Sequence, residues 1–177
     1  MVYTLHYPSP LGTLLLAADG SGLIGLWFEG AKYFAAGLPP EHTEAETPAL
    51  CDAIHWLDLY FSGKEPDFLP QLHPAGSAFR QSVWKILCSI PYGQTRTYGE
   101  IAAQLRAQTG AAHMSAQAVG GAVGHNPISI LIPCHRVVGS NGSLTGYAGG
   151  IQKKLALLEL EHTDVSRFTI PNTGTAL

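Results

Sequence analysis

The first 28 residues alternate short runs of apolar and β-branched side chains with breaks rich in glycine and proline. The runs cover residues 3–7, 12–17 and 23–28, and they are separated by Pro8-Ser9-Pro10 and by Asp19-Gly20-Ser21-Gly22. Breaks of this length are typical of tight connections between antiparallel strands. The pattern therefore predicts an antiparallel sheet at the start of the chain.

One helix is predicted to follow this sheet. Residues 29–46 mix glycine, proline and acidic side chains, which is typical of a loop. Thr47 followed by Pro48 then has the form of a helix N-cap with proline at the first helical position. We expect this helix to run to Gly63. Residues 64–76 hold three prolines and little periodicity, which predicts a linker.

Beyond residue 76 the apolar positions recur at helical spacing. Ser77 is placed to cap a helix that stops before Pro91, and Thr97 begins a Thr-x-x-Glu capping box for a second helix. Two more short helices are expected over residues 116–123 and 150–161. The helices that begin near Thr97 and Ser115 have helix-turn-helix proportions.

These elements indicate two parts of different class, described as α/β + all-α. We expect a small α/β domain over residues 1–74, made of an antiparallel sheet plus a helix and followed by the linker. A helical domain that contains the helix-turn-helix is expected over residues 75–161. Residues 162–177 are expected to form a flexible tail.

Composition narrows the class of protein. Of the 177 residues, 46% are hydrophobic and 13% are charged, which excludes disorder along the whole chain. The longest apolar run is far shorter than the ~20 residues of a membrane-spanning helix, and the N-terminus lacks signal-peptide character. Three cysteines are too few for a disulfide framework. We therefore expect a cytoplasmic protein with no membrane association.

Charge divides the chain more sharply than composition does. Residues 1–74 carry nine acidic and two basic side chains, a net charge of −7, whereas residues 75–161 carry seven basic and three acidic ones, a net charge of +4. Such asymmetry between halves indicates that the second half binds anions.

Cys134 is the strongest candidate for chemistry. It follows a β-branched run and Pro133, and it stands beside His135 and Arg136. A neighbouring cation favours the thiolate and makes the sulfur a better nucleophile. Because adjacent side chains point apart, His135 would act on the sulfur most easily through a bridging water. In isolation, such a pair is more often an inert buried cysteine beside a surface histidine.

The helix expected at residues 116–123 has almost no side-chain bulk. Its two adjacent glycines, Gly120 and Gly121, cost roughly 1 kcal/mol each relative to alanine. Two explanations stay open: close approach of the helix to a sugar–phosphate backbone or narrow groove, or close packing against another helix. The glycine-rich segment 139–150 has no nucleotide-phosphate pattern, so it is either a connector or a loop that exposes backbone N–H groups beside Cys134.

Residues 79–161 resemble the catalytic domain of the O6-alkylguanine-DNA alkyltransferases, which repair DNA by direct reversal. The first 74 residues match that family only in general character. The matching blocks occur in family order and are Phe79…Val83-Trp84, Ile90-Pro91-Tyr92-Gly93, Thr97-Tyr98-Gly99-Glu100-Ile101-Ala102, Ala118-Val119-Gly120-Gly121-Ala122, Asn126-Pro127, Ile132-Pro133-Cys134-His135-Arg136-Val137-Val138 and Gly146-Tyr147-Ala148-Gly149-Gly150.

The resemblance implies a suicide methyltransferase that needs no cofactor. Cys134 would accept the alkyl group from guanine O6 irreversibly, so each molecule would react once. His135 would remove the thiol proton through a water, and Glu161 would orient His135. Asn126 would hold the turn by hydrogen bonds. Tyr98 would help to rotate the lesion out of the duplex and support protonation of the leaving guanine.

The resemblance also implies how the chain meets DNA. The second helix of the motif would enter the minor groove. The damaged base would then be flipped out of the duplex. The residues expected to contact DNA are Gln117, Ala116, Ala118, Gly120, Arg136 and Tyr147. Backbone groups expected to read the extruded base are those of Cys134, Val137 and Ala148. Gln117 stands where the family usually has an arginine, which predicts weaker DNA binding or poorer base extrusion.

The expected partner is double-stranded DNA that contains alkylated guanine, bound by a monomer. Activity on O4-alkylthymine and cooperative binding along DNA stay open. The alternative function is a non-catalytic module that binds alkyl lesions, but such relatives replace the acceptor cysteine and Cys134 is present. A Cys-His hydrolase ranks last. Cys51 and Cys88, at apolar helical spacing, are expected in the core, and no metal-binding pattern involves Cys51, His6, His42 or His55.

Overall fold

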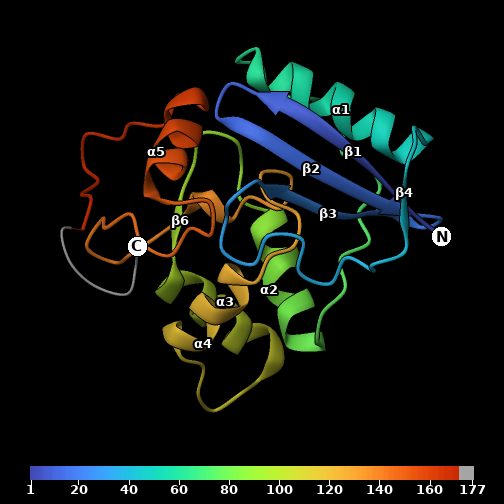
Figure 1. Cartoon of the computed structure of the whole chain (residues 1–177). Helices are drawn as coiled ribbons and strands as arrows, with labels where there is room; N and C mark the ends of the chain where they lie inside the picture. The colour runs from blue at the N-terminus through green and yellow to red at the C-terminus, as the bar shows by residue number, and fades with distance from the viewer. Residues whose placement is uncertain (172–177) are drawn as a thin grey trace. The chain divides into compact units, whose positions relative to one another are not determined.

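The computed structural model describes residues 1–171 (Figure 1). The chain divides into two compact units. The first consists of residues 1–75 together with 127–131, and the second of residues 76–126 together with the chain from residue 132 onward. The predicted class, a small α/β domain followed by a helical domain, is confirmed.

The first unit is a four-stranded sheet covered by one helix. Three antiparallel strands, β1 (Val2–Ser9), β2 (Gly12–Asp19) and β3 (Gly22–Phe28), match the three predicted runs. A short strand that the pattern did not predict, β4 (His42–Glu44), pairs in parallel with β1 and completes the order β3-β2-β1-β4. All three β4 side chains are exposed, so no alternation marks it in the sequence.

The helix α1 (Pro48–Phe61) lies along one face of this sheet (Figure 1). Its N-cap is Thr47 as predicted, with the hydroxyl oxygen accepting a hydrogen bond from the Leu50 N–H at 3.3 Å. The helix ends one residue before the cap Ser62, and Gly63 follows at a φ of +85°. The expected helix is therefore confirmed to within two residues at its C-terminal end.

Two segments outside the named strands pair with β3. In the segment 64–76, expected as a linker, Gln71 accepts a hydrogen bond from the Leu23 N–H at 2.8 Å and His73 donates to the Leu23 carbonyl at 2.7 Å. Residues 127–131 pair with the same strand, because Leu26 donates to the Pro127 carbonyl and Ser129 donates to the Leu26 carbonyl, both at 2.9 Å. The chain just before Cys134 is thus fastened to the first unit.

Up to residue 171, the second unit contains four α-helices and a small parallel sheet. The helices match the four predicted ones, and they are α2 (Ala78–Cys88), α3 (Tyr98–Thr109), α4 (Ala116–Gly124) and α5 (Ile151–Leu160). The capping box of α3 is present, with Thr97 and Glu100 each bonded to the other's backbone N–H. Two-residue strands β5 (Arg96–Thr97) and β6 (Val137–Val138) pair in parallel, which local patterns did not predict.

The part of the expected flexible tail that the structure describes, residues 162–171, packs on the second unit. Thr169 bridges to Ser143, and Val165 and Phe168 pack against a cluster formed by Val138, Leu144, Ile151 and Leu158. These apolar contacts give the segment a fixed course that its sequence did not suggest. The rest of the expected tail, residues 172–177, lies outside the described residues.

The expectation that Cys51 and Cys88 lie in the core is wrong, because both are exposed. The buried face of α1 holds Ala53, Leu57 and Tyr60, and Cys51 lies off that face. Among residues 1–171, no helix is long and apolar enough to cross a membrane. The described residues also include no group of three or more histidines, cysteines and carboxylates that could hold a metal ion.

Candidate active site

Cys134 begins a single 3-10 turn, Cys134–Arg136, that leads directly into β6. Its side chain is buried, and Asn126 fixes its surroundings. The Asn126 Nδ2 donates to the Cys134 Sγ at 3.2 Å and to the carbonyl oxygen of Ile132 at 2.8 Å. One amide group therefore holds both the sulfur and the backbone turn that carries it.

The buried surroundings of Cys134 favour the protonated thiol over the thiolate. Burial raises the pKa of the Cys134 thiol, and the Asn126 hydrogen bond and the charge of Lys154 offset that rise in part. A buried thiolate costs solvation energy, so a nearby base is needed to take the proton as the sulfur reacts. Cys134 thus has the environment of a nucleophile that depends on a base.

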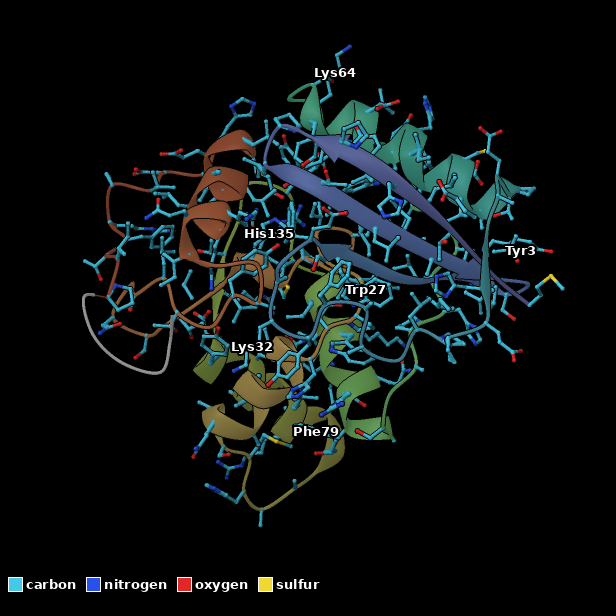
Figure 2. All side chains as sticks on the ribbon, viewed as in Figure 1. Tyr3, Trp27, Lys32, Lys64, Phe79 and His135 are labelled. Atoms are coloured by element: carbon cyan, nitrogen blue, oxygen red, sulfur yellow. The ribbon has the colours of Figure 1, made fainter. Side chains whose placement is uncertain are left out.

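His135, the next residue in the chain, has a ring that is fully buried beside α5 (Figure 2). Its Nε2 lies 2.6 Å from Oε1 of Glu161. Because a carboxylate accepts hydrogen bonds, this contact assigns the ring proton to Nε2 and leaves a lone pair on Nδ1. Nδ1 has no hydrogen-bond partner among the described residues. Burial lowers the pKa of His135 against the opposing charge of Glu161, so the ring is held neutral.

Glu161 is anchored by Arg136 as well as by His135. Arg136 donates from Nε to Oε2 and from Nη2 to Oε1 of Glu161, both at 2.8 Å, and from Nη1 to the carbonyl of Ile90 at 2.7 Å. Burial would raise the pKa of the Glu161 carboxyl, but the charges and hydrogen bonds of His135 and Arg136 outweigh it and hold that pKa below its usual range. The carboxylate therefore stays ionised.

These contacts give Arg136 a different role from the DNA contact that the sequence predicted. We expected it to contact DNA, but its side chain is buried and its guanidinium is committed to Glu161 and the Ile90 carbonyl. A planar guanidinium that binds a carboxylate through two parallel bonds fixes both the position and the charge of that carboxylate. The structure thus makes Arg136 a support for the Glu161–His135 pair.

Sequence reasoning missed Lys154, which is fully buried on α5. Its Nζ donates to the carbonyl oxygen of Thr145 at 2.7 Å, and the hydroxyl of Tyr98 donates to the same oxygen at 2.9 Å. Burial lowers the pKa of Lys154 to about 8, with an opposing effect from Cys134. Its position three residues after Ile151 and four before Leu158, both buried, was the signal that it faces inward.

Tyr98 is the first residue of α3 and packs under the glycine-rich loop. Burial raises the pKa of its hydroxyl to about 12, so the phenol stays protonated at neutral pH. An added Cβ at Gly146, where φ is +77°, would lie 2.8 Å from the Tyr98 hydroxyl oxygen. The loop therefore needs glycine at this position for two reasons, the backbone conformation and the close approach of Tyr98.

The structure removes one of the two explanations for the bare helix α4, close packing against another helix of the chain. A Cβ added at Gly121 would meet no described heavy atom within 4 Å, and one at Gly120 would meet only the Tyr98 ring at 3.9 Å, an ordinary contact. Packing within the chain therefore does not require either glycine. Ala116, Gln117 and Ala118 are exposed, so this part of α4 presents a smooth outer surface.

The remaining expected site residues lie close to the acceptor turn in the chain. Val137 is buried in β6, and Ala148 is half-buried in the glycine-rich loop. Tyr147, which we expected at the DNA surface, is buried, so its side chain contributes mainly to packing. Asn126 is hydrogen-bonded to Cys134 and Glu161 to His135, and Tyr98 interacts with Cys134 electrostatically, so these expected site residues lie together.

Comparison with known proteins gives two matching family models. The model described as "6-O-methylguanine DNA methyltransferase, DNA binding domain" matches residues 78–163. The model described as "6-O-methylguanine DNA methyltransferase, ribonuclease-like domain" matches residues 1–73. Together the two models cover most of the chain, including residues 1–73, which the sequence motifs matched to the family only in general character.

Whole-length relatives agree with these models. The methylated-DNA–protein-cysteine methyltransferase of Mycobacterium tuberculosis is 48% identical over 160 residues, covering 89% of this chain and 92% of the relative. The protein of that name from Haemophilus influenzae is 41% identical over 162 residues, covering 90% and 86%. A crystal structure of M. tuberculosis OGT in complex with DNA matches with a TM-score of 0.74 and 44% identity over 94% of both chains.

Proposed function

The chain belongs to the 6-O-methylguanine DNA methyltransferase family, whose members repair DNA by transferring an alkyl group to a cysteine of the protein, and we propose that Cys134 is that cysteine. The observation that carries this assignment is the chain of contacts around the sulfur. Asn126 holds Cys134, while Glu161, fixed by Arg136, holds a neutral His135 whose Nδ1 is unpaired among the described residues.

In the proposed reaction, the Cys134 sulfur attacks the alkyl carbon on guanine O6. A sulfur–carbon bond forms while the carbon–O6 bond breaks, and the thiol proton passes through one water molecule to Nδ1 of His135. Glu161 stabilises the imidazolium that results. The electron pair leaves with the guanine, whose protonation Tyr98 supports. The proton taken up by His135 is then released, so that overall the alkyl group passes to sulfur and the thiol proton passes to guanine. The thioether product carries no leaving group that the site could expel, so each molecule reacts once.

The damaged guanine must leave the base stack to reach the sulfur. Cys134 is 6% exposed and lies in a turn, so it cannot approach O6 inside a duplex. Rotation of the nucleotide into a pocket solves this problem at a cost of a few kcal/mol. Backbone groups of Cys134, Val137 and Ala148 would bind the edge of the rotated base, since backbone donors and acceptors can read it without bulky side chains.

The duplex itself would be held by α3 and α4 as a helix-turn-helix. The exposed Ala116 and Ala118 and the half-buried Gly120 allow α4 to lie deep in the minor groove, whose readout is degenerate and therefore suits a search for damage. Gln117 would enter the gap left by the base. It can donate and accept hydrogen bonds but lacks the charge and stacking plane of arginine. We propose that a monomer binds alkylated duplex DNA in this way.

Intact mass spectrometry tests the assignment directly. The protein is incubated with a short duplex that carries one O6-methylguanine, in parallel with Cys134→Ser, which keeps a hydroxyl at the same place. We expect each wild-type molecule to gain one methyl group and then stop, and the variant to gain none. Methylation of the variant would place the acceptor elsewhere. Tight lesion-selective binding without any mass gain would instead support a non-catalytic lesion-binding module.

A further inference from the structure

The second unit contains a cavity of about 370 Å³ that none of the proposed chemistry uses. Its walls come from three segments: residues 95–97 with Glu100 at the start of α3, residues 138–142 of β6 and the glycine-rich loop, and residues 167–168 after α5. The cavity therefore lies between the chain that leads into Tyr98 and the chain that leaves the Cys134–Arg136 turn.

Two arginines line this cavity, Arg96 and Arg167. Arg96 donates from Nη1 to the amide oxygen of Gln104 at 2.6 Å, and the guanidinium of Arg167 lies 5.3 Å from the ring centroid of Phe168. Within residues 1–171 neither arginine forms an ion pair with a carboxylate. Both cations are therefore available to an anion from outside.

Among the described residues, Glu100 is the only carboxylate that lines the cavity, and it is occupied locally. Glu100 accepts a hydrogen bond from the backbone N–H of Thr97 at 2.8 Å as part of the α3 capping box. The two arginines and Glu100 leave the lining with a net positive charge. Asp164, three residues before Arg167, accepts its hydrogen bonds from Ser166 and interacts with Arg167 electrostatically without forming an ion pair with it. The remaining polar lining includes the hydroxyls of Thr95 and Ser140, groups that commonly bind phosphate oxygens.

Both arginines are carried on backbone that is fixed to the acceptor turn. Arg96 lies in β5 and pairs with Val137, the residue that follows the 3-10 turn. The segment that carries Arg167 is tied to the glycine-rich loop, because Thr169 donates to the Gly142 carbonyl at 3.0 Å and accepts from the Leu144 N–H at 2.9 Å. Phe168 packs on the apolar cluster beneath. The backbone that carries each arginine is thus fixed to the chain that follows the Cys134–Arg136 turn.

We propose that this cavity binds a phosphate of the DNA backbone near the rotated nucleotide, with Arg96 and Arg167 as its charged ligands. The proposal rests on the proposed function, in which DNA is the substrate. Guanidinium groups bind phosphate oxygens through paired, charge-assisted hydrogen bonds. A backbone phosphate held beside Tyr98 would fix the strand from which the base is rotated, so that binding energy from the phosphate supports extrusion of the base.

The test compares Arg96→Gln, Arg167→Gln and the double variant with Lys64→Gln, which removes one positive charge from an exposed residue of the first unit. Affinity for a short undamaged duplex and for the same duplex with one O6-methylguanine is measured over a series of KCl concentrations. Loss of one phosphate contact is expected to weaken binding of both duplexes about tenfold at low salt. It should also reduce the slope of log affinity against log salt by about 0.9.

A second readout separates this proposal from the proposed function. Transfer from the free base O6-benzylguanine, which has no phosphate, should proceed at the wild-type rate in all four variants. A reduced salt slope together with normal reaction with the free base supports the phosphate site, even if methyl transfer from duplex DNA fails. Slopes and affinities equal to those of Lys64→Gln overturn it. Should Arg96→Gln fail to fold, Arg167→Gln on its exposed segment decides the question alone.

Discussion

The glycines of α4 allow a prediction in which stability and function change in opposite directions. Gly121 lies inside the helix and is exposed, and an added Cβ would meet no described heavy atom within 4 Å. Gly121→Ala therefore fits the folded chain without displacing any neighbour. The substitution changes two things only: the conformational freedom of the unfolded backbone and the outer surface of α4.

The expected sizes follow from those two changes. Replacing glycine by alanine inside an exposed helix stabilises it by about 0.8–1 kcal/mol, which corresponds to a rise in Tm of about 2–4 °C for a chain of this length. If α4 lies in the minor groove, the new methyl group occupies space that the duplex needs. Overfilling a close-packed contact costs about 1–3 kcal/mol, so DNA affinity should fall by roughly 5-fold to 150-fold.

Calorimetry and a fluorescence-anisotropy titration with a labelled duplex measure the two effects in the same preparation. Gly20→Ala is the matched control, because an added Cβ there also meets nothing within 4 Å and Gly20 lies in the turn between β2 and β3. The control should bind DNA like the wild type. Undiminished DNA binding by a stabilised Gly121→Ala protein would refute the placement of this face of α4 against DNA.

Three further predictions concern the acceptor site. Gln117→Arg should speed methyl transfer from duplex DNA, measured by single-turnover kinetics, because guanidinium adds charge and a stacking plane; an unchanged or slower rate would contradict it. Lys154→Met should raise the pKa of the Cys134 thiol and slow its alkylation by iodoacetamide, because it removes a buried positive charge; a faster reaction would reverse the assigned sign. Because the pKa of His135 is lowered in the folded chain, the unfolded chain binds more protons as pH falls below about 6.5, and stability should be lost there. Urea unfolding at a series of pH values should show a smaller loss in His135→Gln, and an equal loss in both proteins would assign the effect to other groups.

Local signals in the sequence predicted the helices well. Two helices begin at N-caps whose partners lie within four residues, the Thr47-Pro48 pair and the Thr97…Glu100 capping box. The groups that begin these helices are therefore visible in the sequence itself. The motif around Cys134 was equally local. The family resemblance added the more distant members of the proposed site, including Glu161.

Pairings between distant segments could not be predicted in the same way. The strand β4, the β5–β6 pair and the bonds of residues 127–131 to β3 depend on partners far along the chain, and none leaves a periodic pattern. The role of Arg136 was predicted wrongly because it also depends on a residue far along the chain. Arg136 turns inward because Glu161 is there to receive it, and a sequence shows the charge of an arginine without showing which way it faces.

The course of residues 127–131 has a consequence for how this protein can be divided. They belong to the first unit, yet the residues on either side of them, Asn126 and Ile132, are joined by a hydrogen bond of 2.8 Å within the second unit. The two units are therefore nested in the sequence and are not arranged one after the other. No single cut separates them, because removal of residues 1–75 leaves five residues without the strand edge that they pair with. A gene fusion or domain exchange that joins two proteins at residue 75 would separate residues 127–131 from the strand β3 with which they pair, so the two units have to be redesigned together.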